Sequence, residues 1–258
     1  MANRSLGPKP KPEVSRHAAC IDPIVFATTQ LGFIPDLHQA QILLRNPRGI
    51  VCCHRQFGKS TTIAVKAVHL AYCRPGSLTI VVAPTLRQSA ETVRKAEAFV
   101  QRLGIRPRGD GDNPVSILFP NGSRIVGLPG TEHTIVGFSN VSLLVVDEAA
   151  RVPDPVYQAL RPTLLNSQGH LWLLSTPLGK RGFFYETWRA APESWTRIHI
   201  SVTANPRVSA DFIAEERATL PHSRFAQDYL CEFLQPENAI FRQEDIDRIF
   251  RDDIEPLD

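Results

Sequence analysis

The stretch IVCCHRQFGKSTT, residues 50–62, constrains the fold more than any other part of the chain. Its four apolar residues, 50–53, predict a buried strand, and the residues from Thr62 towards Tyr72 predict a helix. The turn between them ends in Gly58-Lys59-Ser60-Thr61. Backbone N–H groups at a helix N-terminus attract anions, and the helix dipole adds to this attraction. The order of strand, turn and helix therefore predicts a phosphate-binding loop.

Each residue type in this turn suits a nucleoside triphosphate. Gly58 lets the backbone approach closely, and Lys59 is expected to reach the β- and γ-phosphates. Ser60 is expected to bind Mg²⁺, with Thr61 near the α-phosphate. Cys53 stands where the strict pattern requires glycine. Taken alone, the stretch is explained equally well by an ordinary helix start.

A second stretch, VSLLVVDEA at residues 141–149, predicts an apolar strand that ends in two carboxylates. In an ATP-hydrolysing fold, Asp147 would hold the Mg²⁺ shell and Glu148 would orient and deprotonate the attacking water. An acidic helix N-cap is the alternative explanation. Because a phosphate loop precedes this stretch in the same chain, the catalytic interpretation is favoured.

The remaining pattern predicts an α/β sandwich. Apolar strands at 78–83 and 171–174 alternate with helices such as 86–103, which indicates a mostly parallel sheet covered by helices on both faces. Asn121-Gly122 predicts a hairpin. Ser175 and Thr176 end a strand expected beside the phosphate-loop strand, where they could sense the γ-phosphate, although a capped turn is the favoured explanation when they are taken alone. The aromatic residues of 182–188 are interpreted as core packing rather than a base-stacking platform.

Composition sets broader limits. The chain has 258 residues, 43% of them apolar, which is enough for one good-sized core or two small ones. A net charge of +3 permits a nucleic-acid partner without requiring one. The five cysteines contain no CxxC pair, so reduced core thiols are expected, without disulfide or zinc. The sequence has no signal peptide or membrane-length apolar run, which predicts a soluble cytoplasmic protein, and residues 1–12 read as an extended tail.

Several motifs together resemble the ATPase (motor) domain of a tailed-bacteriophage terminase large subunit. In order they are CHRQFGKST, VVAPT, LLVVDEA, LLSTP and RFAQDYLCEFL. The resemblance implies a P-loop NTPase fold of the RecA-like/ASCE type, with ATP and Mg²⁺ as cofactors. It also implies an ATP-driven motor that packages double-stranded viral DNA into a procapsid in the host cytoplasm, as a homo-oligomeric ring with portal protein and small terminase subunit as partners.

The resemblance also implies roles for single residues. Lys59 and Glu148 would be catalytic, as would Arg55, which would contact the γ-phosphate or hold the loop. Ser175 and Thr176 would couple hydrolysis to movement. A glutamine just upstream of the loop strand can pair with an adenine edge, for which Gln39 is favoured over Gln41. The predicted nucleotide- and Mg²⁺-binding set is Gln39, Arg55, Gln56, Gly58, Lys59, Ser60, Thr61 and Asp147, with Ser60 and Asp147 on the metal.

The chain departs from the family pattern in places. Val136 stands where many relatives have an arginine that reaches a neighbouring subunit's ATP, which leaves Arg124, Arg151 and Arg161 as weak candidates. No nuclease activity is expected, because the chain stops at Asp258 and the acids of 244–255 fit a solvated helix side better than a metal site. Basic residues that could meet DNA phosphates are Arg102, Arg106, Arg108, Lys180 and Arg181, although scattered surface charge is the favoured explanation for any one of them.

The expected organisation is an N-terminal tail with a lid-like helix, a P-loop ATPase core and a C-terminal helical segment, at residues 1–34, 35–204 and 205–258. Two other functions stay open. One is a helicase-like ATPase, which would need a second RecA-like lobe, and the other is a non-catalytic nucleotide-binding assembly subunit.

Overall fold

The structure is a computed structural model that describes residues 20, 22–44, 47–131 and 137–235. Its strands are β1 (Arg48–Cys53), β2 (Leu78–Ala83), β3 (Ser116–Leu118), β4 (Arg124–Pro129), β5 (Leu143–Asp147), β6 (His170–Ser175) and β7 (Thr196–Ile200). Its α-helices are α2 (Pro23–Thr29), α3 (Leu37–Leu43), α4 (Lys59–Cys73), α5 (Leu86–Arg102), α6 (Asp154–Leu160), α7 (Gly182–Ala190), α8 (Ala210–Thr219) and α9 (His222–Asp228). Short 3₁₀ helices are η2 (Ala149–Arg151), η3 (Arg161–Leu164) and η4 (Val202–Ala204).

The seven described strands form one sheet in the order β3-β4-β2-β5-β6-β1-β7. Every pair is parallel except β3 with β4, which form the hairpin predicted from Asn121-Gly122. As predicted, β6 pairs directly with β1. It also pairs with β5, so the phosphate-loop strand and the acidic strand are two strand spacings apart, about 10 Å. Their carboxyl ends therefore meet at one edge of the sheet.

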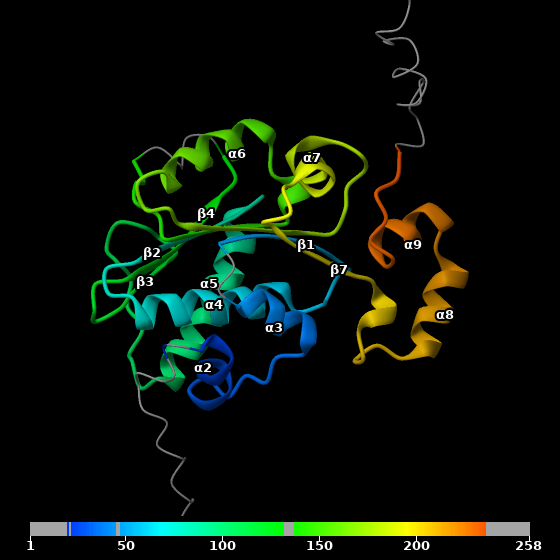
Figure 1. Cartoon of the computed structure of the whole chain (residues 1–258). Helices are drawn as coiled ribbons and strands as arrows, with labels where there is room; N and C mark the ends of the chain where they lie inside the picture. Colours follow the sequence, from blue (N-terminus) through cyan, green and yellow to red (C-terminus); the bar gives the residue numbers. More distant parts are fainter. Residues whose placement is uncertain (1–19, 21, 45–46, 132–136, 236–258) are drawn as a thin grey trace, which may run out of the picture.

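Helices cover both faces of the sheet, as the sequence predicted (Figure 1). Helices α2 to α5 pack on one face, and α6 and α7 pack on the other. Alternate residues of β1 point to opposite faces of the sheet. Val51 and Cys53 pack in the core under α2 to α5, and Ile50 and Cys52 pack in the core under α6 and α7. Helices α8 and α9 lie beyond β7, at the right of Figure 1.

Some local features differ from the sequence prediction. Helix α4 begins at Lys59, one turn earlier than expected. Strand β7 was not predicted, because only Ile198 and Ile200 of this edge strand are buried and polar residues alternate with them. The core interpretation of the aromatic residues is confirmed for Phe183, which is buried and stacks on Tyr157 with ring centroids 4.0 Å apart.

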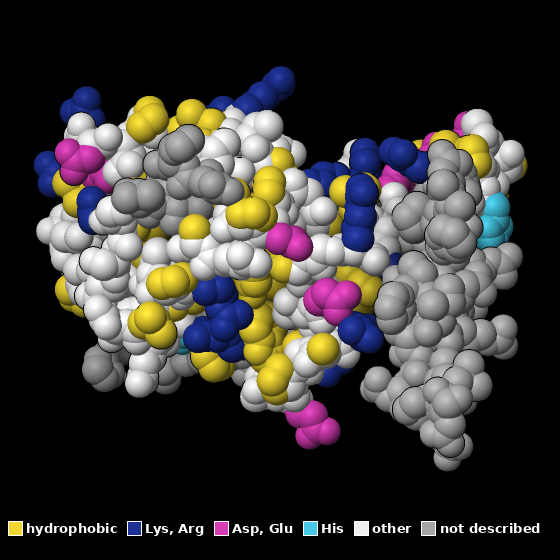
Figure 2. Space-filling view, turned by 90° about the horizontal axis from the view of Figure 1, so that it is seen from above, with side chains coloured by type: hydrophobic (Ala, Val, Ile, Leu, Met, Phe, Trp, Pro, Cys, Tyr) yellow, Lys and Arg dark blue, Asp and Glu magenta, His cyan; other side chains and the backbone are white. Residues whose placement is uncertain are grey.

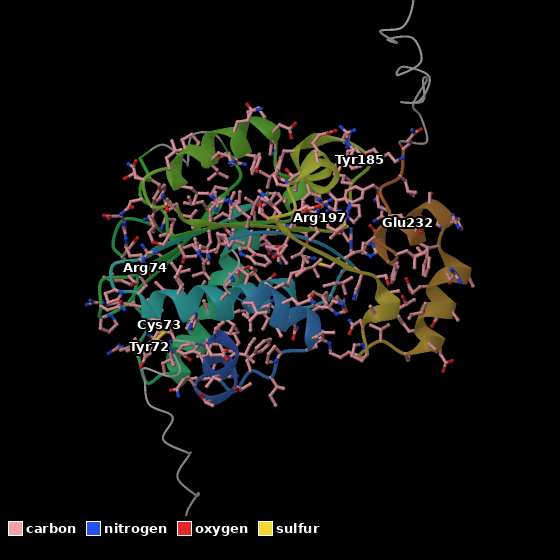
Figure 3. The ribbon with its side chains drawn as sticks, in the orientation of Figure 1. Tyr72, Cys73, Arg74, Tyr185, Arg197 and Glu232 are labelled. Carbon is pink, nitrogen blue, oxygen red and sulfur yellow. A yellow bond between two sulfur atoms is a disulfide. The ribbon has the colours of Figure 1, made fainter. Side chains whose placement is uncertain are left out.

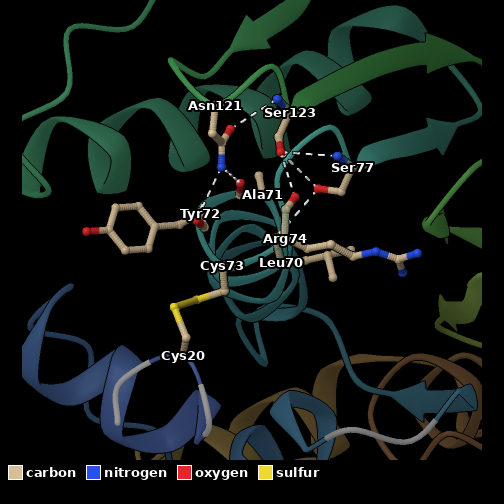
Figure 4. Close-up of a disulfide and its surroundings, with 9 residues drawn as sticks. All are labelled: Cys20, Leu70, Ala71, Tyr72, Cys73, Arg74, Ser77, Asn121 and Ser123. Atoms are coloured by element: carbon tan, nitrogen blue, oxygen red, sulfur yellow. Dashed lines mark hydrogen bonds between the residues drawn. A yellow bond between two sulfur atoms is a disulfide. The ribbon is translucent and has the colours of Figure 1, made fainter. Parts of the chain in front are cut away.

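The prediction that all cysteines are reduced is wrong for one pair. Cys20 and Cys73 form a disulfide with their Cα atoms 5.3 Å apart (Figure 4). The two residues are 53 positions apart in sequence, and they meet because the α2 region packs against α4. Spacing alone does not reveal this packing. Cys52, Cys53 and Cys231 are free and buried, as predicted.

The β3–β4 turn closes the C-terminal end of α4. The last carbonyls of a helix have no partner within it. Here the Asn121 amide donates to the carbonyls of Ala71, at 2.8 Å, and Tyr72, at 3.3 Å (Figure 4). The Ser123 hydroxyl donates to the Arg74 carbonyl at 2.8 Å. Figure 3 shows this end of α4 on the side of the molecule away from α8 and α9.

Three expectations concern residues outside the described ranges: the tail at 1–12, the site of Val136 and the acidic stretch at 244–255. Within the described ranges, none of the helices combines the length and apolar character needed to span a lipid bilayer.

Candidate nucleotide-binding site

The N-terminal end of α4 is open, in contrast to its closed C-terminal end. Gly58, the N-cap residue, has a φ of 99°, in the left-handed region that glycine adopts without strain. No side chain caps the helix here. The first N–H groups of α4 are thus available for an anion, as the predicted phosphate loop requires.

A cavity of about 510 Å³ lies over this helix end. Its charged side chains are four cations, Arg55, Lys59, Lys95 and Arg151, and one carboxylate, Glu148. This excess of positive charge suits a polyphosphate. The full lining is Arg55, Gln56, Gly58, Lys59, Ser60, Gln88, Lys95, Glu148 and Arg151.

The two sequence motifs meet at the wall of this cavity, where Lys59, Ser60 and Glu148 line it and Asp147 does not. The Lys59 amine lies 3.3 Å from Glu148 Oε1, and the Ser60 hydroxyl donates to Asp147 Oδ2 at 3.1 Å. Lys59 is 8% exposed and Asp147 is 6% exposed, so both charges are largely removed from water. The spatial relation on which the ATPase interpretation depends is therefore present.

Burial and charge oppose each other on these groups. Burial disfavours the Lys59 ammonium, but Cys53, Glu148 and Asp147 outweigh it and raise the pKa of Lys59 above its usual value. Burial raises the pKa of Asp147, against the opposing effects of the Lys59 charge and the Ser60 hydroxyl. The lysine is thus kept charged, ready for phosphate.

Glu148 has an unusual backbone. Its φ of 51° and ψ of 42° lie in the left-handed region, which few residues other than glycine adopt. Its carboxylate is bound on both sides, by Lys59 at Oε1 and by Arg151 Nη1 at 3.0 Å from Oε2.

The other predicted residues lie around the cavity with different degrees of access. Arg55 lines it and forms a 3.8 Å ion pair with Asp228 of α9. Gln39 is buried beside Gly58, and its oxygen accepts the Asp36 N–H at 3.0 Å in a capping box. Thr61 lies in the first turn of α4 and does not line the cavity.

Ser175 and Thr176 are buried behind the cavity rather than in its wall. The Ser175 hydroxyl donates to the Thr176 carbonyl at 2.7 Å. Arg151 reaches the same carbonyl at 3.5 Å, so these residues connect to the site through an arginine.

Sequence reasoning missed Gln88 and Lys95, which line the cavity from α5. A signal existed: α5 starts after the carboxyl end of β2, and residues seven apart share one helix face. That this face looks towards the phosphate loop depends on the sheet order, which the sequence does not state.

Several basic candidates have structural partners. Arg102 donates to the Leu31 carbonyl at 2.6 Å. Arg124 pairs with Asp110 at 3.6 Å, and Arg161 donates to the Tyr157 hydroxyl at 3.0 Å. Arg102 and Arg161 are nevertheless exposed, as are the remaining candidates, Arg106, Arg108, Lys180 and Arg181.

Comparison with known protein families gives a direct match. The model of a family described as "Terminase large subunit, T4likevirus-type, N-terminal" matches residues 54–248. The terminase large subunit of Thermus phage G20c is 26% identical over 249 residues, covering 82% of this chain and 51% of that protein. The chain thus spans about half the length of the curated relatives it matches.

Solved structures show the same fold. The large terminase ATPase domain of Thermus phage P74-26 superposes with a TM-score of 0.70 at 24% identity, covering 80% of this chain and 97% of that one. A large terminase from a thermophilic bacteriophage, solved in complex with ADP, gives a TM-score of 0.64 at 14% identity, covering 78% and 54%. The predicted fold class, a mostly parallel RecA-like α/β sheet sandwiched by helices, is confirmed.

Proposed function

The chain belongs to the terminase large subunit family, to the N-terminal part of its T4likevirus type, and on that premise we propose that it is an ATP-hydrolysing motor domain for packaging double-stranded viral DNA. One observation carries the proposal: Lys59 and Glu148 meet in a cationic cavity over the open end of α4, and Asp147 contacts Ser60 at its wall. Family membership disfavours the helicase alternative.

The residues present fit an Mg²⁺ ion. The Ser60 hydroxyl and the Asp147 carboxylate lie 3.1 Å apart, and oxygen groups of this kind are the ligands that Mg²⁺ takes beside a phosphate. When bound, the ion would neutralise charge that develops on the phosphate oxygens. Gln39 would contact the adenine, and Thr61 the α-phosphate.

In this mechanism the chain itself supplies charge, position and a base. Lys59 and the first N–H groups of α4 bind the phosphates, and Arg55 holds the loop or the γ-phosphate. Glu148 orients a water in line with the γ-phosphate and accepts its proton. Ser175 and Thr176 couple the reaction to movement.

The test of this mechanism is Glu148→Ala. Loss of a general base typically costs about 10²- to 10⁴-fold in rate. We expect phosphate release to fall by that factor, while ATP binding is kept. Glu186→Ala is the control, because Glu186 is exposed on α7 outside the cavity lining. A variant with half the wild-type rate would exclude Glu148 as the base. A wild-type protein that binds ATP without releasing phosphate would instead favour the non-catalytic assembly subunit.

Double-stranded DNA is the proposed macromolecular partner. Figure 2 shows Lys and Arg side chains gathered in the notch between the main body and the α8–α9 segment. A cavity of about 790 Å³ in this region has Arg181 and Arg224 in its lining. Contacts to phosphates give binding that weakens with salt and ignores base sequence. Binding of random duplex DNA that is insensitive to salt would contradict this assignment.

The wider assembly is proposed from the family alone. It comprises a homo-oligomeric ring, a portal protein and a small terminase subunit, acting in the host cytoplasm. Residues 1–34, 35–204 and 205–258 would serve as tail with lid-like helix, ATPase core and C-terminal helical segment. A rate per subunit that rises with protein concentration would support a site completed by a neighbouring copy.

A further inference from the structure

Arg151 is fixed over Glu148 by the local backbone. The 3₁₀ helix η2 follows Glu148 directly, and the Arg151 N–H donates to the Glu148 carbonyl at 2.8 Å. A 3₁₀ helix has three residues per turn, so side chains three positions apart lie one above the other. The left-handed backbone of Glu148, which costs about 1–3 kcal/mol in a residue other than glycine, starts this turn. The strained backbone of Glu148 thus starts the turn that brings the Arg151 side chain over the Glu148 carboxylate.

The two oxygens of the Glu148 carboxylate contact two different cations, Lys59 and Arg151. Lys59, 3.3 Å from Oε1, is also the group that a triphosphate requires. Arg151 holds the other oxygen, Oε2, at 3.0 Å. If Lys59 turns to phosphate, Arg151 is the remaining cation for which a contact with this carboxylate is described.

Arg151 has a second anchor outside the cavity. Its Nη1 lies 3.5 Å from the Thr176 carbonyl, which also accepts the Ser175 hydroxyl at 2.7 Å. Thr176 is 1% exposed and follows β6, the strand between β1 and β5. One nitrogen of the guanidinium, Nη1, thus connects the end of β5 to the end of β6.

We propose that Arg151 is the positioning residue for Glu148: its guanidinium is anchored on the Thr176 carbonyl and holds the Glu148 carboxylate towards the cavity. This inference rests on the proposed ATPase function. It assigns Arg151 a role through Glu148 in its own chain, in place of direct contact with phosphate or with a neighbouring subunit's nucleotide.

The test uses Arg151→Ala and Arg151→Lys in the full chain. Misplacing a reacting group by about 1 Å costs about 100-fold in rate, so we expect kcat of Arg151→Ala to fall by about that factor. KM for ATP and Kd for ADP should stay within about twofold, since phosphate binding is left to other groups. Arg151→Lys should recover part of kcat, because an ammonium can still hold one oxygen.

The matched control is Arg189→Ala. Arg189 also follows a glutamate by three positions and lies 2.9 Å from it, but on the exposed surface of α7. Its kcat, KM and Kd should equal those of the wild type. A second check combines Arg151→Ala with Glu148→Ala. If Arg151 acts through Glu148, its loss has no further effect on kcat in that background, and the unfolding free energies of the four proteins without nucleotide are non-additive.

Each other outcome overturns the inference. A rise in KM and Kd with unchanged kcat would make Arg151 a phosphate ligand. A fall in kcat that Arg151→Lys does not relieve, with additive effects in the double variant, would give it a merely structural role. A wild-type kcat in Arg151→Ala would leave it no role at all. Only a wild-type protein without ATP hydrolysis would overturn the proposed function as well.

Discussion

Helix α4 holds two buried lysines in opposite surroundings. Lys59 and Lys66 lie two turns apart on this helix and are 8% and 6% exposed. Lys59 faces the carboxylates of Glu148 and Asp147 at the edge of a cavity. Lys66 donates to the carbonyls that end α3, and its ammonium lies 4.7 Å from the centre of the Trp172 ring. Those carbonyls belong to Ile42, Leu43 and Leu44, at 2.9, 3.4 and 2.9 Å.

The two lysines are buried to a similar extent, so the opposite shifts of their pKa values follow from the charges of their neighbours. Negative neighbours raise the pKa of Lys59, although burial opposes them. Lys66 has only neutral acceptors among its described contacts, and burial lowers its pKa to about 7. Lys59 therefore stays protonated and can bind an anionic ligand, whereas Lys66 caps the C-terminal end of α3.

The two ends of α4 differ in the same way. The N-terminal end has a left-handed glycine and no side-chain cap. The C-terminal end is capped by Asn121 and Ser123 and tied to residue 20 by a disulfide. One end is left open for a ligand, and the other is closed by the fold.

The largest expected effect is that of Lys59→Ala. This change removes the cation for the phosphates, so ATP binding and hydrolysis should both be lost, with kcat/KM reduced by at least about 100-fold. The fold should remain, because no carbonyl depends on Lys59 among its described contacts. Nucleotide titration and steady-state phosphate release measure the two losses. If Lys59→Ala bound ATP as the wild type does, the contrast between the two lysines would fail.

Cys73→Ser tests the closed end. Loss of a disulfide that closes a 53-residue separation should lower the free energy of unfolding by about 2–4 kcal/mol. Denaturant unfolding under non-reducing conditions measures this loss, and Cys231→Ser serves as the control cysteine variant because its thiol is free. ATP affinity should not change. If the wild type were equally stable with and without reductant, the disulfide between Cys20 and Cys73 would not stabilise the fold.

Lys66→Met should have the smallest effect. It leaves the end of α3 without its donor, which costs about 1–3 kcal/mol in unfolding free energy, with ATP hydrolysis unchanged. The pKa of Lys66 is lower in the folded protein, about 7, than in an unfolded chain, about 10.4. The unfolded state then binds more protons between these values, so wild-type stability relative to Lys66→Met should rise with pH across this window.

Denaturant melts of both proteins at pH 7 and pH 10 measure that difference. His170 does not confound it, since burial and the charges of Lys66, Arg48 and Arg74 lower its pKa to about 4 and leave it neutral throughout. If the stability of the wild type relative to Lys66→Met fell with rising pH, folding would raise the pKa of Lys66 instead of lowering it. The contrast with Lys59 would then be wrong.

Much of the site was predictable because its signals are local. Gly58, Lys59 and Ser60 sit at a strand-to-helix turn, and Asp147 and Glu148 end an apolar strand, so short windows reveal each group. The roles of Gln88, Lys95 and Arg151 were not predictable in the same way. Their positions depend on which strands are neighbours and on a single left-handed residue, Glu148, whose conformation no propensity favours.

The cysteines also show that local sequence signals do not predict contacts between distant segments. Spacing correctly predicted Cys52, Cys53 and Cys231 as buried thiols, because an apolar strand or segment buries them wherever it lies. It gave the wrong state for Cys20 and Cys73, whose pairing depends on how α2 folds back on α4.

The sequence by itself determined the alternation of strands and helices, the phosphate loop and the acidic strand end, since hydrophobic period and turn chemistry act over a few residues. Only the tertiary structure decided that β6 separates β1 from β5, that α5 contributes to the cavity and that Arg151 connects Glu148 to Thr176. These relations join residues far apart in the chain, and the packing of the whole sheet fixes them.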